Sequence, residues 1–208
     1  AKFIPIAEKN GTIIPIGNWV LEQSIRTFSE WRNRYGVPFV LSVNISALQY
    51  QKEDFVETLL NIIHKYDVDP DEIELEITES ILIDDFSAVT EKMQLLKEYG
   101  IRISLDDFGT GNSSLSLALE LPFDELKVDM SFIRDIKQKP QNQAMVQSIV
   151  DYARRTNTET CIEGIENKEV SDYIEQFGST WQQGYYYSKP VPIDRFEEVL
   201  REKSTEKE

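Results

Sequence analysis

The feature that most constrains the fold is a repeated alternation of short apolar runs with longer segments of helical periodicity. The apolar runs predict six strands, at residues 39–43, 73–77, 101–105, 125–128, 159–162 and 180–182. The helical patterns lie at residues 19–31, 54–66, 89–96, 141–155, 168–177 and 193–203. Strict alternation of strand and helix predicts a parallel sheet and therefore the α/β class.

Polar residues at the predicted strand ends separate two architectures, a doubly wound sheet and a TIM-type barrel. They are Asn44, Glu76, Asp106, Asp107, Lys127, Glu163 and Gln183. In a barrel all strand carboxyl ends meet on one face, whereas an open sheet gathers ligands mainly at one switch point. Contributions from six successive strands favour the barrel. A barrel needs eight strands and about 250 residues, so two strands are expected to be missing near the N-terminus of this 208-residue chain.

Composition excludes several functions. The net charge of −15 repels polyanions, so we expect no nucleic acid polymer as partner. No apolar run reaches the roughly 18 residues of a membrane helix, and no signal peptide is visible, so we expect no membrane contact within this chain. Cys161 is the single cysteine and can form no intrachain disulfide. A cytoplasmic location is consistent with this cysteine content.

The segment from Asp106 to Ser114 (DDFGTGNSS) carries the strongest local signal. Adjacent carboxylates at a strand end suit a hard cation such as magnesium or manganese. Its glycines permit turns with positive φ or close approach to a phosphate. The segment also fits an ordinary acidic loop with helix capping at Ser113 or Ser114, and the sequence alone leaves both interpretations open.

Strand alternation indicates where the other polar residues point. Glu76 and Lys127 each lie between apolar neighbours, so they are expected to face the barrel interior. A carboxylate there is costly unless it is paired or binds metal, although a solvated Glu76 and a structural ion pair of Lys127 remain alternatives. Asn44 offers an amide oxygen to a metal or a turn cap, and Glu79 fits either a loop-ordering role or a helix start.

The combined set favours oxygen ligands. Glu163, followed by Gly164, is a candidate ligand or proton acceptor with Glu166 as its neighbour. His64 falls on a predicted surface helix, and Cys161 is expected in the core. The set therefore suits Mg²⁺ or Mn²⁺ rather than zinc, and metal-assisted hydrolysis of a phosphate ester. We expect ordinary packing, rather than base stacking, for residues 185–187.

At this point the sequence resembles the EAL-domain phosphodiesterases. The resemblance rests on seven motifs that occur in the family's order. They lie at residues 3–8, 43–46, 74–80, 106–111, 126–129, 163–166 and 183–185. It implies a modified TIM barrel that begins with an antiparallel hairpin. It also implies hydrolysis of cyclic di-GMP to the linear dinucleotide pGpG, with one or two Mg²⁺ or Mn²⁺ ions.

The resemblance assigns roles to individual residues. The implied metal ligands are Asn44, Glu76, Asp106 and Asp107. Lys127 and Glu163 would position the attacking water, with Glu163 also a candidate ligand of a second metal. Glu79 would hold the loop after Asp107, and Gln183 and Asp129 would lie near the substrate.

One departure concerns the start of the chain. The Glu-Ala-Leu signature of the family should precede residue 3 and is absent. We therefore expect residues 1–203 to form an EAL domain without its first two strands, residues 204–208 to be a disordered tail, and the chain as written to be inactive. A homodimer and an upstream sensory or cyclase domain in the parent protein are further expectations from the family.

Two other functions remain as alternatives to the enzyme. The first is a catalytically inactive receptor that binds cyclic di-GMP without cleaving it. The second is an unrelated magnesium-dependent barrel enzyme, such as an enolase relative, in which Lys127 would act as a base. The retained motifs favour the phosphodiesterase.

Overall fold

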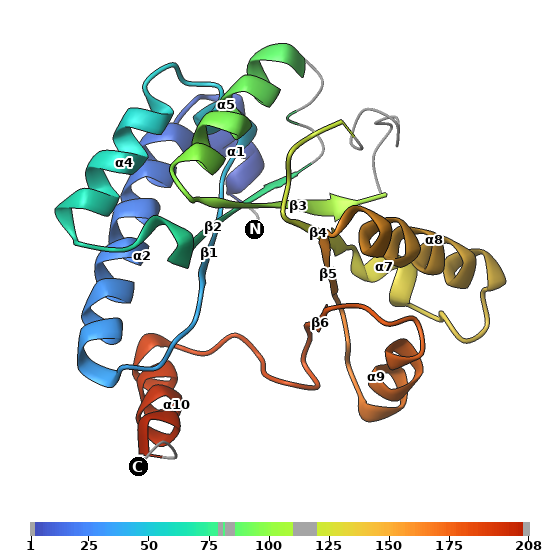
Figure 1. Ribbon diagram of the computed structural model, residues 1–208. Helices are drawn as coiled ribbons and strands as arrows, with labels where there is room; N and C mark the ends of the chain where they lie inside the picture. The colour runs from blue at the N-terminus through green and yellow to red at the C-terminus, as the bar shows by residue number, and fades with distance from the viewer. Residues whose placement is uncertain (1–2, 79–80, 82–85, 110–119, 206–208) are drawn as a thin grey trace. The chain divides into compact units, whose positions relative to one another are not determined.

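The computed structural model describes residues 3–78, 81, 86–109 and 120–205, which form two compact units. The first unit comprises Ala1–Ile77, Gln94–Arg102 and Pro190–Glu208, and the second comprises Thr78–Met93 and Ile103–Lys189. Each unit contains parallel strands and helices, which confirms the predicted α/β class. Figure 1 shows these elements coloured along the chain.

The first unit is built around one parallel strand pair. Its strands are β1 (Leu41–Asn44) and β2 (Ile73–Thr78, whose last residue belongs to the second unit), with Leu41 opposite Ile73. Its helices are α1 (Ile4–Lys9), α2 (Ile13–Tyr35), α3 (Ala47–Tyr50), α4 (Phe55–Lys65), the 3-10 turn η1 (Pro70–Glu72) and α10 (Ile193–Thr205). Helices α2 and α4 pack side by side (Figure 1).

Helix α2 shows how the sequence pattern produces this unit. Leu21, Ile25 and Phe28 recur at helical spacing and are fully or almost fully buried. The helix ends at Gly36, whose φ of 62° is the left-handed conformation that glycine adopts most readily. Trp19 begins the helical pattern of residues 19–31, and its side chain is 64% exposed. It lies two residues before Leu21, about 200° around the helix, and so points away from the core.

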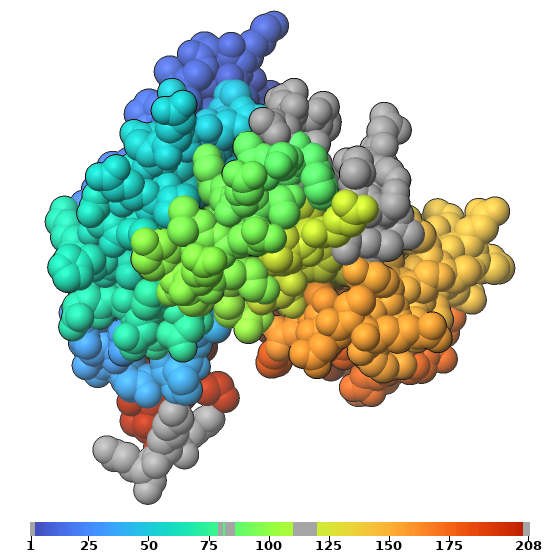
Figure 2. Space-filling model, turned by 45° about the horizontal axis from the view of Figure 1, so that its top comes forward, coloured from blue at the N-terminus to red at the C-terminus, as the bar shows by residue number. Residues whose placement is uncertain are grey.

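The second unit contains four parallel strands that pair in chain order. They are β3 (Arg102–Phe108, whose first residue belongs to the first unit), β4 (Glu125–Val128), β5 (Glu159–Ile162) and β6 (Trp181–Gln182). Its helices are α7 (Met130–Ile133), α8 (Pro140–Thr156) and α9 (Lys168–Glu175). Helix α5 (Phe86–Glu98) begins in this unit and ends in the first. Figure 2 shows the adjoining yellow and orange surfaces of the α7 and α8 segments.

The elements agree with the periodicity except where they are short. Strand β3 is longer than predicted because it continues through an irregularity between Leu105 and Phe108. The sequence did not predict α1, α3 or α7, since helices of four to six residues are too short to show a periodic apolar face. Helix α10 continues to Thr205, beyond the end predicted near Lys203. Within the described ranges, no helix is both long and apolar enough to cross a membrane.

Candidate active site

Glu76 lies in β2 between two apolar residues, and its side chain points to the side that this alternation predicts. Leu75 and Ile77 are fully buried on one face, and Glu76, on the other face, is only 9% exposed. Asn44 lies directly opposite Glu76 in the parallel register. Its Nδ2 donates a hydrogen bond of 2.8 Å to Glu76 Oε2. Because the amide donates through Nδ2, its oxygen and the Glu76 carboxylate are the potential metal ligands on this strand pair.

Lys127 is the centre of a charged cluster in the second unit. Leu126 and Val128 are fully buried on one face of β4, whereas Lys127 points to the other face and is 4% exposed. Its Nζ lies 2.9 Å from Glu163 Oε1 and 3.6 Å from Asp106 Oδ1. The two carboxylates supply negative charge that offsets the cost of removing the lysine from water.

The two aspartates at the end of β3 have different backbone conformations. The strand irregularity after Leu105 places Asp107 at a φ of 55°, where its amide donates a 2.9 Å hydrogen bond to Asp106 Oδ1. The pKa of Asp107 is raised, first by burial and then by the negative charges of Asp106 and Asp129, against the opposing charge of Lys127. Carboxylates that repel one another in this way gain from a bound cation.

Glu163 follows β5 at a turn that requires glycine. Its amide donates to the Val128 carbonyl at 3.1 Å, which continues the ladder between β4 and β5. Gly164 has a φ of 75°, and a Cβ there would lie 2.5 Å from the Cβ of Met130. The turn therefore holds Glu163 beside Lys127 at a place where the chain cannot carry a larger residue.

The other predicted site residues lie in different surroundings, and one of them is outside the described residues. Gln183 lies just past β6, with its Oε1 4.0 Å from the Cys161 thiol. Asp129 caps α7 by accepting a 2.9 Å hydrogen bond from the Ser131 amide. Glu166 is exposed, and Glu79 lies outside the described residues. His64 is exposed on α4 and Cys161 is buried, as the sequence predicted.

The donor set fits a hard divalent cation in its chemistry. All the candidate ligands offer carboxylate or amide oxygens, which suit Mg²⁺ and Mn²⁺. Among the described residues, no group of three or more histidine, cysteine, aspartate or glutamate side chains is already arranged to hold an ion. The chemistry of the residues, rather than a formed cage, therefore supports metal binding.

The sequence interpretation was wrong about residues 185–187. These three tyrosines were expected to pack in the ordinary way, but they are 61%, 41% and 53% exposed. It also missed Ser171 and Gln182, which share hydrogen bonds with Tyr187. The available signal was strand alternation, because Gln182 must point to the opposite face from Gln183.

The chain is similar to known proteins over nearly its whole length. The model of the EAL domain family matches residues 1–190. The signaling protein YkoW of Bacillus subtilis is 34% identical over 205 residues, which are 99% of this chain and 26% of that protein. The cyclic di-GMP phosphodiesterase PA2567 of Pseudomonas aeruginosa is 34% identical over 201 residues, 97% of this chain and 34% of that protein.

Solved structures extend the likeness to the fold. The PaMucR phosphodiesterase in complex with c-di-GMP is 33% identical with a TM-score of 0.88, covering 94% of this chain and 79% of that one. The EAL domain of Mycobacterium smegmatis DcpA is 32% identical with a TM-score of 0.84, covering 89% and 84%. These neighbours confirm the predicted TIM-barrel-like α/β fold. The chain spans about a quarter to a third of the length of the two relatives named above, and it belongs to the EAL domain family.

Proposed function

We propose that this chain contributes the catalytic domain of a metal-dependent phosphodiesterase that hydrolyses cyclic di-GMP to the linear dinucleotide pGpG. Two kinds of support converge on this proposal. The family includes relatives that are named cyclic di-GMP phosphodiesterases and match nearly all of this chain. The strand ends also retain the acidic and amide residues, together with a buried lysine, that such chemistry needs.

The arrangement around Lys127 is the single observation that carries the proposal. A lysine with 5% of its side chain exposed contacts Glu163 and Asp106, whose side chains are 19% and 14% exposed. A purely structural ion pair needs one carboxylate, and an apolar pair of similar volume is often as stable. A buried lysine that contacts two partly accessible carboxylates is instead suited to holding a water molecule and a phosphate oxygen.

In the proposed reaction, the oxygen of a water molecule forms a bond to one phosphorus of the cyclic dinucleotide. The phosphorus–O3′ bond breaks, which gives a 5′-phosphate, and the released 3′-oxygen takes up a proton from solvent water to become the 3′-hydroxyl. Glu163 accepts a proton from the water, and the Lys127 ammonium stabilises the negative charge on the reacting phosphate and orients the water. Gln183 and Asp129 contact the substrate, and Glu79 orders the loop after Asp107.

Asn44, Glu76, Asp106 and Asp107 would hold one or two Mg²⁺ or Mn²⁺ ions. When bound, such ions lower the pKa of water and neutralise charge on the phosphate oxygens. All four supply oxygen donors at strand ends: Asn44 and Glu76 are opposite one another in the register of β1 and β2, and Asp106 and Asp107 lie at the irregularity of β3. We place no histidine or cysteine in the site, which distinguishes it from a zinc hydrolase.

The test is hydrolysis of cyclic di-GMP by the natural protein that carries this chain, with Glu163→Gln as the variant. The proposal predicts linear dinucleotide from the natural protein, at least a 100-fold lower kcat in the variant, and unchanged nucleotide binding. Glu169→Gln is the matched control, because it makes the same chemical change on an exposed side chain of the same unit. Nucleotide binding without any product in the natural protein would contradict the enzyme and establish the receptor.

A further inference from the structure

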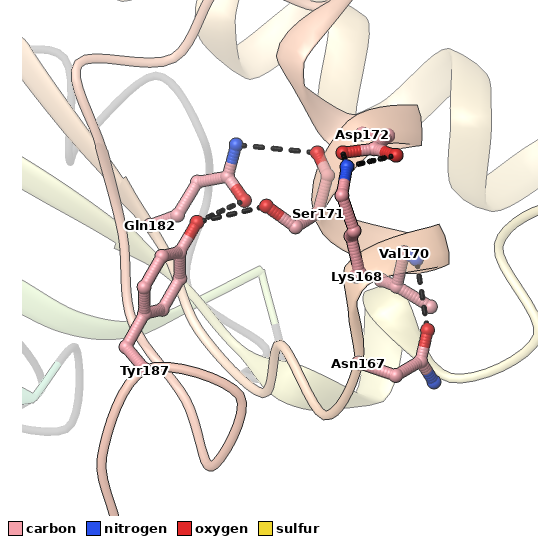
Figure 3. Close-up of polar contacts among 7 residues, drawn as sticks. All are labelled: Asn167, Lys168, Val170, Ser171, Asp172, Gln182 and Tyr187. Carbon is pink, nitrogen blue, oxygen red and sulfur yellow. Dashed lines mark hydrogen bonds and ion pairs between the residues drawn. The ribbon is translucent and has the colours of Figure 1, made fainter.

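The two glutamines at the end of β6 point to opposite faces and have different partners. Gln183 contacts Cys161, which pairs with Lys127 in the register of β4 and β5, so its side chain lies on the Lys127 face. Gln182 points to the other face, toward α9 (Figure 3). Its Nε2 donates to the Ser171 carbonyl at 3.4 Å, and its Oε1 accepts from the Tyr187 hydroxyl at 3.0 Å.

The Tyr187 hydroxyl completes a closed triangle of contacts. It also lies 2.8 Å from the Ser171 hydroxyl, within hydrogen-bond distance. Ser171 is only 5% exposed on α9, which fixes one corner of the triangle within a packed helix. Figure 3 shows the tyrosine reaching back across the strand end to meet both partners. We call Tyr187, Ser171 and Gln182 the outer clamp.

The clamp closes over a short strand end that is also tied by two reciprocal hydrogen bonds between Thr160 and Thr180. Strand β6 has two residues and pairs with β5. Beyond it, the Gln183 amide donates to the Ile162 carbonyl, and the Gln183 carbonyl accepts from the Ile165 amide. In so short a strand the register matters, because a shift of one residue would turn Gln183 to the opposite face.

The turn after Gln183 also meets the segment that follows Glu163. Its chain is closed by bonds from the Tyr187 and Ser188 amides to the Gly184 carbonyl, and the Tyr186 amide donates to the Ile165 carbonyl. A Cβ on Gly184 would lie 2.2 Å from the Ile165 carbonyl oxygen, so the two backbones are in direct contact. The backbone of residues 184–186 therefore contacts the segment that follows Glu163 directly.

We propose that the outer clamp positions Gln183 toward the substrate by fixing the opposite face of the same strand end. The clamp residues do not touch the substrate in this account. They act through the backbone at residues 182–187, which joins the Tyr187 hydroxyl to the Gln183 side chain. This inference rests on the proposed function, because it assumes that Gln183 contacts cyclic di-GMP.

The first test is the kinetics of Tyr187→Phe and Ser171→Ala in the natural protein. Tyr187→Phe removes the hydroxyl and keeps the ring. Ser171→Ala removes the hydroxyl and keeps the backbone carbonyl that accepts from Gln182. We expect KM for cyclic di-GMP to rise about threefold to fivefold in each, with kcat within about twofold, because a binding contact is lost equally in the ground and transition states. Because Tyr187→Phe already removes the bond that Ser171→Ala breaks, the double variant should have the same KM as Tyr187→Phe.

Tyr186→Phe is the matched control. Tyr186 is the neighbouring tyrosine, and no hydrogen bond of its hydroxyl is recorded within the described residues, so its KM should not change. A clamp that only stabilises the fold would lower the melting temperature of Tyr187→Phe and leave KM unchanged. That result would overturn the proposal.

Hydrogen exchange separates failure of the clamp from failure of the proposed function. If the natural protein neither binds nor hydrolyses cyclic di-GMP, the proposed function fails. Amide exchange then shows independently whether the outer clamp fixes the strand end. Faster exchange at Gln183 and Tyr186 in Tyr187→Phe, but not in Tyr186→Phe, would support a clamp that fixes the strand end. Unchanged exchange at both amides would overturn it.

Discussion

The Asn44–Glu76 pair in the first unit and the Lys127 cluster in the second use different means to place carboxylates at strand ends. In the first, a neutral amide donates to a buried glutamate and adds no compensating charge. In the second, a buried ammonium contacts two carboxylates directly. The Lys127 cluster therefore brings its own positive charge to its two carboxylates, whereas Asn44 contributes a hydrogen bond and no charge to Glu76.

The largest effect is expected from Lys127→Met, which removes the ammonium but keeps most of the volume. Activity should fall about 10³-fold or more, and the free energy of unfolding should fall by about 3 kcal/mol, because two carboxylates lose their partner. Turnover and urea denaturation measure the two effects. Lys137→Met is the control, since its pair with Glu169 is exposed and should contribute little. Stability equal to that of the control would contradict the organising role of Lys127.

The next effect concerns the first unit. In Glu76→Gln, Asn44 can still donate its hydrogen bond, but the ligand charge is gone. We expect the metal concentration for half-maximal activity to rise about 10-fold to 100-fold, with little change in stability. Glu57→Gln, an exposed change on α4, should leave the metal requirement unaltered. A Glu76→Gln protein with the natural metal requirement would exclude Glu76 as a ligand.

Asn44→Asp sharpens the comparison without relying on catalysis. The new carboxylate would face Glu76 at the distance where the amide now donates, 2.8 Å. Without divalent metal, the free energy of unfolding should fall by about 1–3 kcal/mol, because a hydrogen bond is replaced by repulsion. Added Mg²⁺ or Mn²⁺ should restore the melting temperature. A loss that is insensitive to metal would argue against an ion at this pair.

The smallest effect is expected on the surface of α9. Lys168 forms an exposed pair with Asp172, next to the outer clamp but separate from it (Figure 3). Lys168→Ala should leave KM unchanged and shift the melting temperature by no more than about 1 °C, because solvent screens such pairs. A rise in KM would mean that α9 as a whole, rather than the clamp, positions Gln183.

The fold was predictable wherever apolar residues recur over several turns or strands. Leu75 and Ile77 on either side of Glu76, and Leu126 and Val128 around Lys127, predict the inward direction of the two charged residues, and both are buried. The resemblance to a known family completed the barrel assignment, because counting strands alone left two of eight unaccounted for.

The rest depends on contacts that local patterns do not encode. The exposure of residues 185–187 was missed because an aromatic run resembles a packed segment in sequence. The link from Tyr187 to Ser171 joins residues 16 positions apart, and it forms only when α9 packs beside β6. The left-handed conformation of Asp107 arises from a strand irregularity rather than from a glycine.

The proposed function of these strand ends is metal-dependent hydrolysis of cyclic di-GMP. The most direct measurement follows linear dinucleotide formation by the natural protein before metal removal by a chelator, after removal, and after Mg²⁺ or Mn²⁺ is added back. The account predicts turnover that stops on removal, returns with metal, and stays at least about 100-fold lower in Glu163→Gln under every condition. Turnover that continues without metal, or that is unaffected by Glu163→Gln, would contradict it.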